Sequence, residues 1–154
     1  MDSDLPEHAL PPEILQRASR AGNEYAWRVQ DIPELIEAAR LSNLISTGGQ
    51  LQFRLPDGGT CECYWVEVDT YKSVDKALPW QERVTRTAEV ALRDFQALQS
   101  GVDFIAEGRV LFARQLEALV AQGRDPADSM YFVWYVMSEA DAKARDLQTS
   151  ARDE

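Results

Sequence analysis

The chain has 154 residues, of which 45% are hydrophobic and 27% are charged, as expected for one folded domain rather than a disordered segment. Its 16 basic and 26 acidic residues give a formal net charge of −10, which disfavours nucleic acid and anionic membranes as partners. No apolar run reaches the roughly 20 residues of a membrane span, and the N-terminal sequence lacks the apolar stretch of a secretory signal. We therefore expect a cytoplasmic protein.

The first twelve residues are polar and acidic and predict a flexible N-terminal arm, so that a single domain is expected at residues 13–150. Residues 13–21 predict a short helix with Gly22 as its stop. Residues 24–30 alternate apolar and polar side chains, which is the pattern of a half-buried strand.

A second helix is expected to begin after Asp31, where three start signals coincide. Asp31 is placed to act as the N-cap, Pro33 falls in the first turn, and Glu34 completes an arrangement like a capping box. The pair Gly48-Gly49 is interpreted as the turn that closes this segment.

The clearest pattern in the sequence is a β-hairpin with strands at residues 50–55 and 60–69. The residues between them, 56–59, read Pro-Asp-Gly-Gly and favour a chain reversal. The returning strand is rich in β-branched and aromatic residues, but its apolar side chains change face partway along. This change predicts either two partly covered faces or a bulge near Trp65.

The second half of the chain predicts two long helices, at residues 79–99 and 103–122, from apolar residues at helical spacing. The second of these is expected to bury one face, formed by Val110, Leu111, Arg114, Ala118 and Leu119. Residues 130–137 favour a strand buried on both sides, with a helix as the alternative. Ser138 then begins a terminal helix to about residue 148.

Together these elements predict an α+β domain. Its antiparallel sheet is expected to have about four strands, with the hairpin at its centre and helices packed mainly on one face. This architecture is similar to that of small acidic bacterial immunity proteins, which neutralise toxins. The similarity implies an inhibitor-type protein that binds another protein.

The sequence offers few residues for catalysis. His8, the only histidine, lies in the expected arm, which leaves no Ser-His-Asp or Cys-His arrangement. Cys61 and Cys63 are expected to be reduced and packed in the sheet, and no phosphate-binding glycine motif is present. We therefore predict no catalytic residue, no metal and no cofactor.

One alternative function is a metal-dependent hydrolase. Asp57, followed by carboxylates on the next strand, resembles in part the PD-(D/E)-x-K pattern of metal-dependent nucleases. Such a site needs a lysine beside its acidic ligands. In Glu67-Val-Asp69 an aspartate stands at that position, and Lys72 lies three residues further on.

The leading hypothesis is a non-enzymatic protein-interaction module with a basic partner. The predicted partner-binding residues combine negative charge with aromatic anchors: Glu62, Glu67, Asp69, Tyr71, Asp75 and Trp80. A second interpretation of Tyr71 and Trp80 is that they seal the junction between the hairpin and the long helix. A homodimer formed through residues 130–137 is a further possibility.

Overall fold

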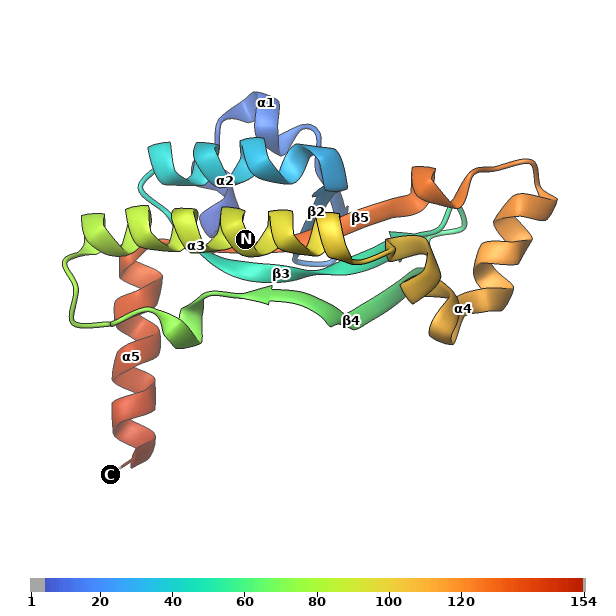
Figure 1. Ribbon diagram of the computed structural model, residues 1–154. Helices are drawn as coiled ribbons and strands as arrows, with labels where there is room; N and C mark the ends of the chain where they lie inside the picture. Colours follow the sequence, from blue (N-terminus) through green and yellow to red (C-terminus); the bar gives the residue numbers. More distant parts are fainter. Residues whose placement is uncertain (1–4, 154) are drawn as a thin grey trace.

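A computed structural model describes residues 5–153 and shows a five-stranded antiparallel sheet with its main helices on one face (Figure 1). The predicted α+β class is confirmed, with five strands instead of four. In chain order the strands are β1 (Ser19–Ala21), β2 (Glu24–Arg28), β3 (Ile45–Arg54), β4 (Thr60–Asp69) and β5 (Met130–Met137). Across the sheet their order is β1-β2-β5-β3-β4. The hairpin β3–β4 therefore forms one side of the sheet, not its centre as predicted, and β5 is the central strand.

The helices cover one face of this sheet and its two ends. They are α1 (Pro12–Leu15), α2 (Ile32–Leu41), α3 (Trp80–Gly101), α4 (Phe104–Ala121) and α5 (Glu139–Asp153). Short 3-10 helices lie at Pro6–Ala9, Val29–Asp31, Tyr71–Ser73 and Pro126–Ser129. The helices α2 and α3 lie along the sheet, α4 projects beyond the hairpin, and α5 leaves on the opposite side (Figure 1). Among the helices of residues 5–153, none is long and apolar enough to cross a membrane.

The core lies between the sheet and the helices α2 and α3. One row of paired residues, Trp27, Phe132, Leu51 and Cys63, crosses four strands, and each of these side chains is at most 1% exposed. Phe95 of α3 packs edge-on against Phe132, with 5.2 Å between the ring centroids. Burial of these large apolar side chains is the main stabilising contribution to the domain.

Residues 130–137, for which the sequence favoured a strand over a helix, form the strand β5. It lies at the centre of the sheet, with β2 paired to one edge and β3 to the other. Phe132 and Trp134 face the helices while Val133 faces the other side, and all three are fully buried. Because both edges are already paired, this segment cannot extend the sheet of a second copy.

The predicted helix at residues 13–21 is wrong in its second half. The helix α1 ends at Leu15, and Ser19–Ala21 pairs with β2 as a fifth strand. Gly22 lies in the turn between these strands with a φ of +62°. Pairing with a neighbouring strand supplies backbone hydrogen bonds that one helical turn does not, so tertiary context overrides local propensity.

The helix α2 begins at the predicted place but without the predicted side-chain cap. Asp31 has a helical backbone conformation, and its carboxylate accepts no capping hydrogen bond. Glu34 instead forms an ion pair with Arg17 at 2.6 Å. The start signals therefore located the helix, although the capping mechanism was wrong.

Gly48 and Gly49 lie inside β3, not in a turn as predicted. A Cβ on Gly49 would lie 1.8 Å from the carbonyl oxygen of Val133, and one on Gly48 would lie 1.9 Å from that of Val68. Gly48 also has a φ of +127°. Thr47 is bulged out of the β3–β5 pairing just before them. The two glycines therefore allow close approach of the neighbouring strands beside a bulge.

The helix α4 covers the predicted range but buries a different face. Val110 and Leu111, predicted to be buried, are 67% and 60% exposed, whereas Leu119 is buried as predicted. The backbone at Phe112 is non-helical, so the helix is kinked there and its phase changes. The buried residues are Phe104, Gly108, Leu116 and Leu119.

The segment expected to form an arm includes buried side chains. Residues 1–4 of it lie outside the described residues, whereas Glu7 and Leu10 are 6% and 4% exposed. Burial raises the pKa of the Glu7 carboxyl above its usual value, and Asp141 adds to this effect. A hydrogen bond from its own backbone amide, together with His8 and Arg20, acts in the opposite direction. One oxygen of this carboxyl has no hydrogen-bond partner.

Gly49→Ala is expected to lower the free energy of unfolding by about 3 kcal/mol, because the added methyl group must displace the β5 backbone. Gly101→Ala is the matched control, since a Cβ there meets no atom within 4 Å. We expect that control to change the stability by less than about 0.5 kcal/mol. Urea unfolding followed by tryptophan fluorescence measures both, and equal effects would contradict the prediction.

Glu7→Gln is expected to stabilise the protein at neutral pH. Because the folded state holds the Glu7 proton more tightly than the unfolded state, wild-type stability falls as pH rises from about 4.5 through the raised pKa. Glutamine does not ionise, so the variant does not lose stability in this way. The difference in the free energy of unfolding between variant and wild type should therefore grow as the pH rises from about 4.5 through the raised pKa. Urea unfolding of both proteins at several pH values measures the difference, and a difference independent of pH would refute the assignment.

Candidate functional site

The face of the sheet turned away from α2 and α3 is not covered by a helical layer among the described residues (Figure 1). Two rows of paired residues cross this uncovered face. The first row is Arg28, Tyr131, Gln52 and Glu62, and the second is Ala26, Val133, Gln50 and Glu67. The face therefore carries polar side chains on all four strands, and Ala26 of β2 and Val133 of β5 are the apolar members of these two rows.

A bulge in β4 determines which side chains reach this face. The β3–β4 register passes from Gln50 paired with Glu67 to Leu51 paired with Cys63, so one step along β3 corresponds to four along β4. Residues Tyr64–Val66 are the extra residues. Because strand side chains alternate, an odd number of extra residues reverses the phase. Of the two alternatives predicted for this strand, the bulge near Trp65 is the one that the structure contains.

Three predicted binding residues share the uncovered face as a result of this bulge. Glu62, Glu67 and Asp69 are exposed, whereas the apolar side chains on both sides of the bulge face the core. Tyr64 lies in the bulge with 63% of its surface exposed. Without the bulge, Glu62 and Glu67 would point to opposite faces.

A shallow hollow of about 210 Å³ lies on this face, where the sheet meets α5. Its lining includes Gln50, Glu67, Asp69, Tyr71, Tyr135 and Arg145. The Tyr71 ring contacts two cations, with Arg145 at 4.5 Å and Lys76 at 4.9 Å from its ring centroid. Its hydroxyl donates a hydrogen bond to Asp146 at 3.2 Å. Tyr71 therefore joins the connection after β4 to the C-terminal helix.

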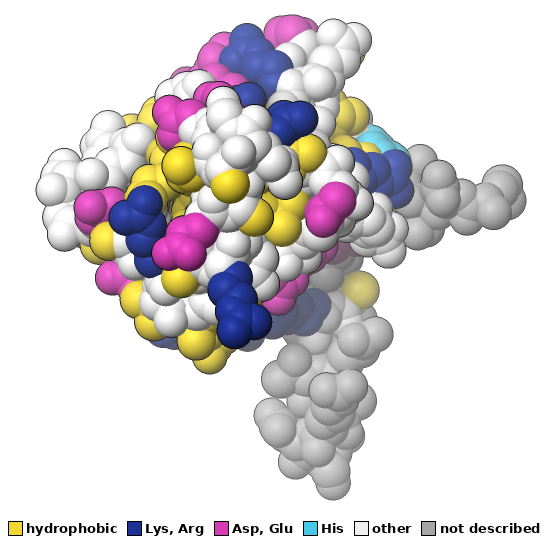
Figure 2. Space-filling model, turned by 90° about the vertical axis from the view of Figure 1, so that its right-hand side faces the viewer, with side chains coloured by type: hydrophobic (Ala, Val, Ile, Leu, Met, Phe, Trp, Pro, Cys, Tyr) yellow, Lys and Arg dark blue, Asp and Glu magenta, His cyan; other side chains and the backbone are white. Residues whose placement is uncertain are grey.

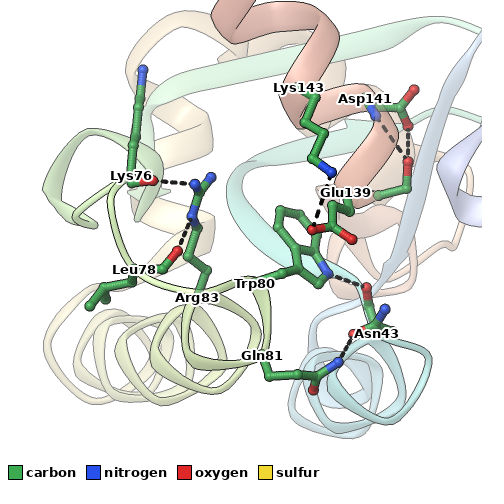
Figure 3. Close-up of polar contacts among 10 residues, drawn as sticks. Asn43, Lys76, Leu78, Trp80, Gln81, Arg83, Glu139, Asp141 and Lys143 are labelled. Atoms are coloured by element: carbon green, nitrogen blue, oxygen red, sulfur yellow. Dashed lines mark hydrogen bonds and ion pairs between the residues drawn. The ribbon is translucent and has the colours of Figure 1, made fainter.

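The other two predicted binding residues lie apart from this group. The Trp80 indole N–H donates to the carbonyl oxygen of Asn43 at 3.0 Å, so Trp80 joins α3 to the end of α2 (Figure 3). Glu139 and Lys143 of α5, drawn in the same view, form an ion pair at 3.7 Å (Figure 3). The carboxylate of Asp75 accepts the backbone N–H of Ala77 at 2.9 Å and stabilises a turn.

A polar network on the uncovered face was not predicted from the sequence. Arg54 donates from Nη1 to the carbonyl oxygen and the hydroxyl of Ser19, and from Nε to Gln52 at 2.8 Å. Gln52, only 1% exposed, donates in turn to Glu62 at 3.3 Å. The side chains of Arg54 and Gln52 thereby link strands β1, β3 and β4. The Nη2 atom of Arg54 is shielded from solvent and has no partner, and burial lowers the pKa of this guanidinium.

Tyr135 joins the hollow to strand β2. Its hydroxyl donates a hydrogen bond to Glu24, and its ring lines the hollow. Burial, together with the hydrogen bond to Glu24, raises the pKa of the Tyr135 phenol above its usual value, so it stays neutral even in alkaline solution. The site thus presents neutral phenol and amide groups beside exposed carboxylates.

The structure brings together no metal site among residues 5–153: no three His, Cys, Asp or Glu side chains there could hold an ion. Asp57 accepts the backbone N–H of Gly59 at 2.8 Å within the hairpin turn. Cys61 and Cys63 are buried and unpaired, and burial raises the pKa of Cys63 to about 11. The hydrolase hypothesis therefore has no ligand set in the described part of the chain.

No family model matches the chain, and neither the curated proteins nor the solved structures include a significant match.

Arg54→Lys is expected to lower the free energy of unfolding by about 1–2 kcal/mol, because a single ammonium cannot reproduce the bonds to both Ser19 and Gln52. Arg93→Lys is the control, since Arg93 forms only an exposed ion pair with Asp94. Its cost should stay below about 0.5 kcal/mol. Urea unfolding measures both, and an equal cost at the two sites would refute a structural role for the network.

Proposed function

We propose that this chain is a non-enzymatic protein-interaction module, of inhibitor type, that binds a basic protein through the uncovered face of its sheet. The observation that carries the proposal is the alignment of Glu62, Glu67 and Asp69 on that face by the β4 bulge. Three carboxylates on one rigid strand attract a basic surface and hold it in a fixed orientation. The net charge of −10 extends the same attraction over a longer range.

The surroundings of the carboxylates also support the proposal. Tyr64, at 63% exposure, and Tyr135, at 36%, flank them with aromatic surface. Tyrosine is enriched among the residues that dominate binding energy at protein interfaces. The network around Arg54 holds the strands beneath in a fixed geometry, so binding would require little rearrangement.

Two further features suit a cytoplasmic location, which we include in the proposal. Cys61 and Cys63 are unpaired and buried, as is usual in a reducing compartment. Their elevated pKa values keep the thiols protonated and unreactive.

The double variant Glu67→Lys and Asp69→Lys is expected to lose the basic partner that the wild type retains. Tagged protein captures its partner from a lysate of the native source, and mass spectrometry identifies and quantifies it. The matched control is Glu82→Lys with Glu89→Lys, an equal change of charge on the exposed side of α3. We expect about a hundred-fold less partner on the first variant and no change on the control, as two lost charge pairs imply. Equal retention by both variants, or no retained partner at all, would refute the proposal.

A further inference from the structure

The outer edge of β4 offers a second mode of recognition next to the acidic side chains. Strand β4 is ten residues long and lies at the border of the sheet, with β3 as its one paired neighbour (Figure 1). At the opposite border, β1 has only three residues. Among the described residues no strand pairs with the outer side of β4, so the backbone groups directed there have no strand partner.

The hydrogen bonds at the two ends of β4 show which residues direct their backbone outward. The Leu55 amide donates to the carbonyl oxygen of Gly59 at 2.8 Å, and the Thr70 amide donates to that of Thr47 at 3.1 Å. In an antiparallel ladder, residues bonded to the partner strand alternate with residues whose N–H and C=O point away from it. We count inward from the bonded residue at each end of β4. The residues whose backbone N–H and C=O groups point away from β3 are then Thr60, Glu62, Glu67 and Asp69.

The residues with outward backbone groups are therefore the ones that carry the exposed acidic side chains. We infer that β4 binds an extended, basic segment of the partner protein by strand addition. Alternate Lys or Arg side chains of that segment would pair with Glu62 and Glu67 while its backbone continues the sheet. This inference rests on the proposed function and names how that partner is recognised.

The bulge at the middle of β4 supplies an apolar contact for the same segment. The Tyr64 ring packs edge-on against Trp65, and the Trp65 indole donates to Glu107 of α4 at 2.8 Å. One turn further along α4, Val110 and Leu111 are exposed. Figure 2 shows hydrophobic side chains, interspersed with both acidic and basic ones, on the end of the molecule that carries α4. An apolar residue between basic ones would suit this surface.

Charge selects a basic partner over a second copy of this chain. If two β4 edges paired, the outward-bonding residues of one copy would face those of the other, and three of the four are acidic. Like charges placed opposite each other destabilise strand pairing. The edge is thus unsuited to self-association and suited to a segment of opposite charge.

The test uses two substitutions of Glu67 that remove the same charge. Glu67→Gln keeps the outward backbone N–H, whereas Glu67→Pro removes it, and proline is tolerated on an edge strand where the N–H faces solvent. The probe is a short synthetic peptide that alternates lysine and valine, with a glutamate–valine peptide of equal length as its control. Fluorescence anisotropy gives the Kd, and amide hydrogen exchange shows where the peptide lies.

The lysine–valine peptide should bind the wild type, and the glutamate–valine peptide should not. Binding should slow exchange of the Glu62 and Glu67 amides. Glu67→Gln should raise the Kd about three-fold, and Glu67→Pro about ten-fold further, because the proline also blocks backbone pairing. If Glu67→Pro does not fold, Thr60→Pro against Thr60→Ala makes the same comparison at the other end of the edge.

Strand addition would be overturned by equal Kd values for the proline and glutamine variants, by no slowing of amide exchange on β4, or by no binding of the basic peptide. A wild-type molar mass of twice 17.4 kDa, with β4 at the interface, would assign the edge to a second copy and also overturn it. Loss of the captured partner in the Glu67→Lys, Asp69→Lys variant, alongside equal Kd values, would leave the proposed function standing without this inference.

Discussion

The bulge at Tyr64–Val66 is the constraint on which the two faces of this sheet depend. Before the bulge, Cys61 and Cys63 face the core; Val66, the last residue of the bulge, and Val68 beyond it are buried there as well. A regular strand of this sequence would place half of these apolar side chains in water and bury carboxylates in their place. Burying an unpaired carboxylate is far more costly than losing a few ladder hydrogen bonds, so the bulge is the lower-energy solution.

A second irregularity, at Thr47 in β3, is stabilised by side chains that replace the missing ladder bonds. The Ser46 amide donates to the Thr87 hydroxyl at 3.2 Å, and the Thr70 hydroxyl donates to the Ser46 carbonyl oxygen. The Trp134 indole reaches the Ser46 hydroxyl at 3.3 Å. These buried bonds tie β3 to α3 and to the end of β4, so the strand that carries the acidic side chains is anchored at the end where it leaves the hairpin.

Local patterns predicted the elements whose signals lie within a few residues of one another. The hairpin, α3 and the central strand β5 were recognisable because alternation, turn residues and helical spacing are properties of a single segment. The strand β1 and the glycines of β3 were missed because their structure is set by partners distant in sequence. Gly49 must be small because of Val133, and nothing within its own segment indicates this.

The candidate site likewise contains some residues that the sequence predicted and others that only the folded structure reveals. Glu62, Glu67 and Asp69 were predicted from composition, and the phase reversal that aligns them was one of two interpretations of the sequence. The role of Arg54 was not predictable, because alternation placed its side chain on a polar face where solvent would normally satisfy it. Only the folded sheet brings it to Ser19, 35 residues away in sequence. Kinking of α4 at Phe112 likewise exposed Val110 and Leu111, which helical spacing had assigned to the core.

The acidic side chains of β4 therefore act in two ways that are physically inseparable. A long unpaired strand is prone to uncontrolled pairing, and charge along such an edge is a common protection against it. The same charge lowers the free energy of any complex with a segment of opposite sign and raises that of a complex with an identical chain. Because backbone direction and side-chain face share the period of two, the residues that protect the edge are the ones whose N–H and C=O groups would bond a partner strand. Selectivity at this edge thus follows from strand geometry together with the placement of three carboxylates.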